Sequence, residues 1–168
     1  MAPLSVAAEG RWRDWDGLEP GLTDRAVATA FGLDPAAIEA GAGRLSSRRL
    51  PMRTVRAAGE PRLRWWLGDD GAVGLVQVAD PRSSPDLNTV VAALGTPERE
   101  GAGRHLVSGA TTTELVWPGR GLSLTVADSY EDPPAWPRRL ASALLFPATD
   151  LRTFVLDLGG NDRGGPSW

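Results

Sequence analysis

The sequence predicts an α+β domain in which short helices pack on one face of an antiparallel sheet, arranged as two tandem helix-then-hairpin repeats. Two short segments have the apolar spacing of an amphipathic helix and end at a glycine. After each of them come two segments that alternate apolar and polar residues around a Gly-containing turn, as in a β-hairpin. With 168 residues, of which 42% are hydrophobic, the chain is large enough for one packed core.

The first helix is predicted at residues 23–32. Thr23 can cap its first turn, and Asp24 suits the positive end of a helix. Gly32 can end it in a left-handed conformation. The residues expected to face the core are Val27, Ala30 and Phe31.

The segment between this helix and the first hairpin has a mixed pattern. Asp34-Pro35 can start a short helical turn through Ala40, ended by a flexible Gly-Ala-Gly at 41–43. Residues 44–55 contain Pro51, which favours an edge strand or two short pieces over a central strand. The first hairpin is clearer, because residues 63–67 alternate and 73–78 run back after a Gly-Asp-Asp-Gly turn.

The second unit opens with a strong helix signal at residues 84–95. Ser84 is a cap, Pro85 stands at the first helical position, and Gly95 follows as a stop. The predicted buried stripe is Leu87, Val90, Val91 and Leu94. Residues 96–109 are interpreted as a loop, and 113–126 as the second hairpin, with its turn at 118–121.

The remaining segments complete the predicted organisation. Residues 140–146 indicate a further strand, and Thr149 can cap a last helical turn through Leu156. The predicted organisation is an N-terminal arm with at most one short strand (1–16), a first helix-plus-hairpin unit (17–82), a second unit sharing the same core (83–158), and a loose tail (159–168).

Composition narrows the classes of function. The chain has no cysteine, so disulfides and thiolate chemistry are excluded. Its first residues lack the pattern of a signal peptide, and no segment approaches the roughly 20 apolar residues of a membrane helix, so we expect a cytoplasmic protein with no membrane partner. The net charge of −3 opposes nucleic-acid binding.

Two phrases resemble a known family. They are Leu-Glu-Pro-Gly-Leu-Thr at 18–23, followed by Val27 and Phe31-Gly32, and Val-Ala-Ala-Leu-Gly-Thr-Pro-Glu at 91–98. Both are similar to the opening of the SmpA/OmlA-type outer-membrane lipoproteins. Tandem pairs of that helix-then-sheet unit make up the β-lactamase-inhibitor-protein-like fold, and the resemblance covers residues 17–146.

The resemblance implies a helix layer on one face of an antiparallel sheet and a concave open face that binds other proteins without catalysis. Members of the family are usually exported, and the inhibitor proteins carry disulfides, whereas this chain has no cysteine. The resemblance therefore implies the fold and leaves partner and compartment open.

Few residues are candidates for catalysis or metal binding. The only histidine, His105, has Ser108 and Glu100 near it in sequence but no second base. A metal site would need His105 with carboxylates such as Asp128, Glu131 and Asp132, which no regular spacing brings together. We therefore predict no catalytic residue, no metal and no cofactor.

An arginine cluster is the strongest candidate for a docking surface. Seven arginines fall within residues 44–64, with Glu60 as the only acid. Strand alternation places Arg62 and Arg64 beside Trp66, opposite the apolar side of the strand. Arginine and tryptophan often dominate interface energetics, although a solvated face that discourages edge pairing would have the same pattern.

The sequence therefore favours a non-enzymatic protein-binding module, of inhibitor, immunity or accessory-subunit type. An acidic partner protein would suit its arginine cluster. The predicted partner-binding residues are Trp66, Arg62, Arg64, Trp117, Arg48 and Arg49. Trp117 also matches Trp65 as a core position. The outlying tryptophans fit either a binding surface or a lid over the core edge, and they are Trp12, Trp15, Trp66 and Trp136. One alternative is a small-molecule-binding or enzymatic domain with His105 and Glu114 in a pocket between sheet and helices.

Overall fold

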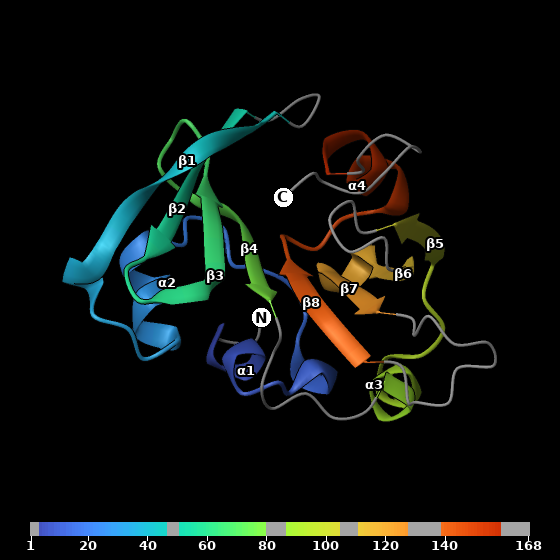
Figure 1. The fold of residues 1–168 in the computed structure, drawn as a ribbon. Helices are drawn as coiled ribbons and strands as arrows, with labels where there is room; N and C mark the ends of the chain where they lie inside the picture. Colours follow the sequence, from blue (N-terminus) through green and yellow to red (C-terminus); the bar gives the residue numbers. More distant parts are fainter. Residues whose placement is uncertain (1–3, 47–50, 80–86, 105–110, 128–138, 159–168) are drawn as a thin grey trace.

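The computed structural model describes residues 4–46, 51–79, 87–104, 111–127 and 139–158, which form an α+β structure (Figure 1). Its strands are β1 (Ile38–Ser46), β2 (Pro51–Ala57), β3 (Glu60–Leu67), β4 (Val73–Ala79), β5 (Arg99–Arg104), β6 (Thr111–Trp117), β7 (Leu122–Ala127) and β8 (Arg139–Leu145). Its helices are α1 (Leu4–Ala8), α2 (Asp24–Ala30), α3 (Leu87–Leu94) and α4 (Leu151–Asp157), with 3-10 turns η1 (Trp12–Asp14), η2 (Pro35–Ala37) and η3 (Pro118–Arg120).

Within the described residues, the strands form one eight-stranded antiparallel sheet in the order β1-β2-β3-β4-β8-β7-β6-β5. Helix α2 and turn η2 precede the first run of four strands, and α3 precedes the second. The last strands of the two runs, β4 and β8, pair at the centre. The first strand of each run therefore lies at an edge.

One face of the sheet, here the helix face, carries the main core. Strand residues such as Leu63, Trp65, Val76 and Leu124 pack there against Leu4 of α1, Trp12 of η1, Val27 of α2 and Val90 of α3. The opposite side is here called the far face, and it meets α4 instead. Figure 1 shows α4 well apart from α1, α2 and α3. Successive strand residues alternate between the two faces, so the register fixes which side chains reach each layer.

Several predicted elements are confirmed. Helix α2 begins after Thr23, whose Oγ1 accepts a hydrogen bond from the Ala26 amide at 3.3 Å. Helix α3 buries Leu87, Val90 and Leu94 and is followed by Gly95 with a φ of 82°. Strands β3 and β4 form the first predicted hairpin, and β6 and β7 form the second. The predicted cap of α3, Ser84, lies outside the described residues.

Two Gly-Ala-Gly segments are strands, so their interpretation as flexible or loop residues was wrong. Residues 41–43 lie inside β1, and 101–103 lie inside β5. Residues 101–103 pair with β6, whereas 41–43 lie at a register shift between Ala40 and Arg44, on either side of which β1 pairs with β2. The neighbouring strand therefore supports an extended conformation that the low strand propensity of glycine does not predict. Gly41 also approaches β2 closely, because a Cβ there would lie 2.8 Å from Cγ2 of Thr54.

Smaller boundaries differ as well. The turn begun by Asp34 ends at Ala37, and β1 starts at Ile38, so the predicted helical turn through Ala40 is too long. The last helix is capped by Asp150, not by Thr149 as predicted. Both differences are shifts of one to three residues in an element boundary, which is the range over which local sequence signals overlap.

The N-terminal segment is helical, and its predicted short strand is absent from the described residues 4–16. Helix α1 and turn η1 pack into the main core, where Trp12 and Trp15 are 2% and 1% exposed. These two tryptophans therefore act as the lid over the core that the sequence left as an alternative to a binding surface.

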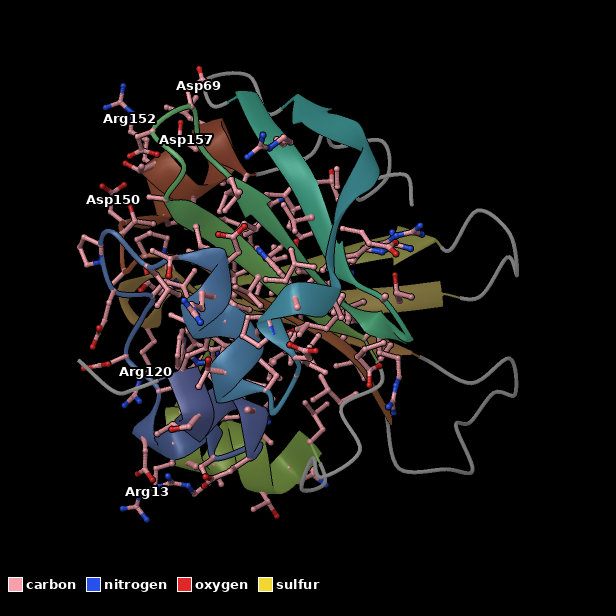
Figure 2. All side chains as sticks on the ribbon, turned by 90° about the vertical axis from the view of Figure 1, so that its left-hand side faces the viewer. Arg13, Asp69, Arg120, Asp150, Arg152 and Asp157 are labelled. Atoms are coloured by element: carbon pink, nitrogen blue, oxygen red, sulfur yellow. The ribbon has the colours of Figure 1, made fainter. Side chains whose placement is uncertain are left out.

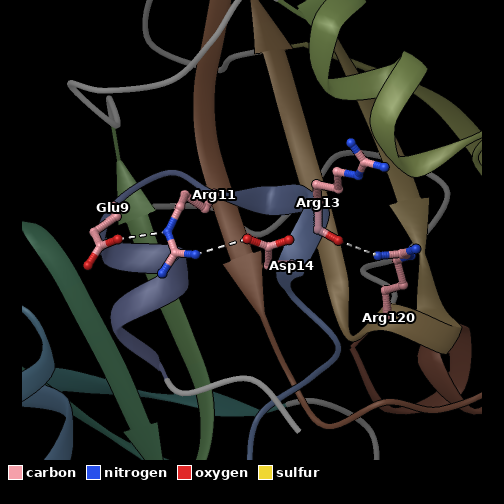
Figure 3. A network of polar contacts seen from close by, with 5 residues as sticks. All are labelled: Glu9, Arg11, Arg13, Asp14 and Arg120. Atoms are coloured by element: carbon pink, nitrogen blue, oxygen red, sulfur yellow. Dashed lines mark hydrogen bonds and ion pairs between the residues drawn. The ribbon is translucent and has the colours of Figure 1, made fainter.

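Polar contacts hold this segment together and join it to η3, the turn between β6 and β7 (Figure 3). Arg11 bridges Glu9 at 2.7 Å and Asp14 at 2.9 Å. Arg120 donates to the backbone oxygen of Arg13 at 3.0 Å. Figure 2 shows the Arg13 side chain at the periphery of the molecule, so only its backbone takes part in this contact.

Candidate functional site

Trp66 lies on the far face, as alternation predicts, but it is not on an open surface. Its side chain is 4% exposed and packs in an apolar cluster with Leu75, Val116, Phe146 and Phe154 of α4. Trp66 is therefore covered by α4 and does not lie on an open sheet face, in contrast to the sequence-based expectation. The physical reason is that α4, which is distant in sequence, covers this end of the far face.

Trp117 lies on the opposite side of the sheet, in the main core. It is 4% exposed, and its Nε1 donates a hydrogen bond to the backbone oxygen of Gly95 at 3.0 Å. Trp117 is therefore a buried core residue and not part of an exposed sheet face. This agrees with the other role expected for Trp117, as a core residue at the position equivalent to Trp65.

Arg62 and Arg64 share the far face with Trp66, as predicted from alternation. Arg62 is partly buried and binds Glu60, with Nε to Oε1 at 3.1 Å and Nη2 to Oε2 at 3.2 Å. Arg64 is exposed. The other two predicted arginines, Arg48 and Arg49, lie outside the described residues.

The strand register sets Arg64 in a row of residues that runs across the whole far face. Each member stands directly opposite the next on the neighbouring strand. From edge to edge the row is Glu39, Arg56, Arg64, Gln77, Leu144, Ser123, Val116 and Arg99. Positive charge therefore gathers on β2 and β3, while the centre of the row is neutral.

Arg56 and Arg64 form a like-charged cross-strand pair on this row. Residues directly opposite in an antiparallel pair have Cβ atoms roughly 5 Å apart, and like charges there are destabilising. Arg56 is relieved on its other side by Glu39, with Nη2 to Oε2 at 3.4 Å. Among the described residues Arg64 has no ion pair, and its other cross-strand neighbour is the neutral Gln77. An anion placed over the two arginines would relieve this repulsion.

An apolar patch borders the arginines on the same face. It consists of Trp66, Leu75, Val116 and Phe146, and we call it the α4 patch because α4 covers it. Phe154 of α4 supplies the main contact, with its ring centroid 5.0 Å from that of Phe146. Partly buried Leu151 and Leu158 flank Phe154 on the helix.

Asp150 holds the start of α4. Its Oδ1 accepts from the Thr153 amide, and its Oδ2 accepts from the Thr153 hydroxyl, both at 2.9 Å. The backbone hydrogen bond from Thr153 is the main reason that the pKa of the Asp150 carboxyl lies below its ordinary value.

This cap makes the helix content of α4 dependent on pH. Because the folded pKa of Asp150 is lowered, its stabilisation is complete above the unfolded pKa of about 3.9 and is lost as pH falls through the folded pKa. We expect the helical Cα chemical shifts of residues 151–157 to decline below about pH 4. Asp150→Asn keeps a capping side chain that does not titrate in this range, so its shifts should stay level. Identical pH profiles for the two proteins would contradict the cap's role.

The polar pair nearest to a catalytic arrangement lies on the far face too. Ser123 Oγ donates to Glu114 Oε1 at 2.7 Å. Glu114 stands opposite Thr125, away from the helix face, so it does not line a space between sheet and helices as the alternative hypothesis requires. His105 lies outside the described residues, and the described ranges hold no group of three or more metal-ligating side chains.

Sequence reasoning included Arg56 in the arginine cluster but did not select it, and it missed the contributions of Glu39 and Gln77. These three residues are neighbours of Arg64 only through the strand register, which brings together residues that are far apart in the sequence. The signal that was available for Arg56 is its alternation with Val55 and Ala57, both of which are buried.

Comparison of the chain with family models, curated proteins and solved structures gives no match. Across the described ranges, no helix has the length and apolar character needed to cross a bilayer. Any function must therefore be inferred from the arrangement of side chains on the sheet.

Proposed function

We propose that the chain is a non-enzymatic protein-binding module that takes an acidic segment of another protein on the exposed part of its far face. Arg56 and Arg64 are the proposed anchors. Inhibitor, immunity protein and accessory subunit are the roles that such a module would fill. The observation that carries the proposal is the like-charged pair of exposed arginines directly opposite each other on β2 and β3.

The proposed attraction for acidic segments is local to Arg56 and Arg64. The chain as a whole has a net charge of −3, so acidic proteins are not attracted to it in general. Arginine binds carboxylates in a planar, two-point geometry, and two adjacent guanidinium groups favour a segment with several acidic residues. Binding should weaken with salt, because exposed charges are screened over about 8 Å at physiological ionic strength.

We also propose that the two runs of four strands are tandem copies of one unit, as in the β-lactamase-inhibitor-protein-like fold. Support comes from the shared order of a helix followed by four antiparallel strands, with β4 and β8 meeting at the centre. The two edge strands also share the sequence Gly-Ala-Gly-Arg, at 41–44 and 101–104. This arrangement would leave the far face as the binding surface, as the family resemblance implies.

Selection from a random displayed peptide library tests the docking proposal without knowledge of the natural partner. Purified protein should enrich peptides rich in Asp and Glu, and their affinity should fall as NaCl is raised from low to well above physiological concentration. The double variant Arg56→Glu/Arg64→Glu should bind the selected peptides at least about tenfold more weakly, roughly the loss of one charge-assisted contact or more.

The matched control is Arg13→Glu/Arg25→Glu, which makes the same change in net charge at two exposed residues away from the far face. It should retain the affinity of the unmodified protein. Equal losses in the two double variants would show that only net charge matters, and enrichment of non-acidic peptides would count against an acidic partner. Either result would overturn the proposal.

A further inference from the structure

Helix α4 shows which kind of segment fits the α4 patch. Leu151, Phe154 and Leu158 have the i, i+3, i+7 spacing of one helix face, and all three contact the patch cluster. The helix is an amphipathic segment lying on an apolar surface, which is also a common way for proteins to recognise a partner's helix. The patch is therefore already shaped for a Leu-x-x-Phe-x-x-x-Leu pattern.

The attachment of α4 is limited. Phe154 is the only fully buried residue within the helix, and Val155 is 39% exposed. By comparison, α3 buries Leu87, Val90 and Leu94 in the main core. Elements with few buried apolar contacts are those that open locally while the rest of a domain stays folded.

The patch and the proposed arginine anchors form one continuous surface. Arg64 and Trp66 are two residues apart on the same side of β3, a separation of about 7 Å along a strand. On β2, Arg56 and Thr54 stand directly opposite them. A segment lying on the patch therefore reaches the arginines without crossing another element of the described sheet.

We infer that the α4 patch is the second half of the docking surface, and that it accepts an amphipathic helix of the partner in place of α4. This inference rests on the proposed function and specifies the partner's chemistry. The partner segment would carry a Leu-x-x-Phe-x-x-x-Leu face flanked by acidic residues that reach Arg64. Helix α4 then acts as an internal competitor, and the need to displace it lowers the partner's apparent affinity.

A synthetic peptide with the α4 sequence, residues 149–158, is the probe. Phe154→Ala removes the anchor of α4 but leaves the patch intact, so this variant should bind the fluorescent peptide at least about tenfold more tightly than the unmodified protein. Asp150→Ala, which loses only the cap, should show a smaller gain. Val155→Ala changes an exposed side chain of the same helix and should match the unmodified protein.

A second form of the peptide, extended with several glutamates, tests the contact with the arginines. In the Phe154→Ala background it should bind more tightly than the plain peptide, and Arg64→Glu should abolish the difference. If Arg64→Glu leaves the difference intact, the arginine half of the surface is wrong while the patch stands. If library peptides bind through the arginines but Phe154→Ala gains no affinity for the probe, the patch is wrong while the proposed function stands.

Hydrogen exchange in the unmodified protein keeps the inference testable even if Phe154→Ala fails to fold. Amides of α4 should exchange at least about tenfold faster, relative to their intrinsic rates, than those of β8. If α4 and β8 exchange together through global unfolding, α4 cannot be displaced and the inference is overturned.

Discussion

Gly121→Ala is expected to remove about 4–5 kcal/mol of folding free energy, enough to prevent folding of a marginally stable domain. Gly121 has a φ of 56°, in the left-handed region that residues with a Cβ avoid. A Cβ there would overlap the backbone oxygen of Phe146 and lie 2.9 Å from Cα of Gly17. Both neighbours are backbone atoms, so the clash cannot be relieved by a side-chain rotation.

The same glycine joins three parts of the molecule, which is why its environment is so crowded. Its backbone oxygen accepts from the Phe146 amide at 3.0 Å and from Trp15 Nε1 at 3.2 Å. A backbone shift large enough to make room for the added methyl group would disturb both contacts. We therefore expect loss of the cooperative transition in urea denaturation, or a greatly lowered midpoint.

Gly71→Ala is the matched control. Gly71 also has a positive φ, 79°, but a Cβ added there would have open space around it, with no atom beyond its chain neighbours within 4 Å. Its substitution should cost only the left-handed penalty of about 1–2 kcal/mol. Similar midpoints for the two variants would show that backbone crowding around Gly121 has little effect on stability.

Helices α2 and α3 were predictable because their signals are local, whereas α1 in the N-terminal segment was not predicted. The cap at Thr23 and the glycine stops at 32 and 95 all lie within one or two turns of the residues they control. The hairpins β3–β4 and β6–β7 were predictable for the same reason, since alternation and turn residues stand side by side in the chain.

The edge strands β1 and β5 depend on neighbours that the local sequence does not reveal. Gly-Ala-Gly has neither the alternation nor the β-branched residues of a typical strand. In β5 these residues pair with β6, and in β1 they form an irregularity flanked by residues that pair with β2, so both strands depend on a neighbouring strand. The repetition of Gly-Ala-Gly-Arg at both edges was visible in the sequence and could have pointed to equivalent positions.

The sequence predicted on which face of the sheet the candidate site lies, but it did not predict which of its side chains are exposed. Alternation placed Arg64 and Trp66 on one side of the strand, and the register confirms this placement. The residues near Trp66 in the sequence do not indicate that Phe154, far along the chain, packs in the same cluster. Burial of this kind depends on tertiary contacts, so a tryptophan that the strand pattern places on the surface can still be covered.

Trp15→Ala should lower the free energy of unfolding by about 3–5 kcal/mol, the usual cost of removing a large buried aromatic side chain. Trp15 is 1% exposed, its Nε1 donates to Gly121, and its backbone oxygen accepts from Arg120 at 3.3 Å. The N-terminal segment therefore completes the core instead of extending from it as an arm. Arg13→Ala, two residues away, should change the unfolding free energy by no more than about 0.5 kcal/mol, because its side chain is exposed. If chemical denaturation gave the two variants the same stability, the segment would be peripheral, and its tryptophans would again be candidates for a binding surface.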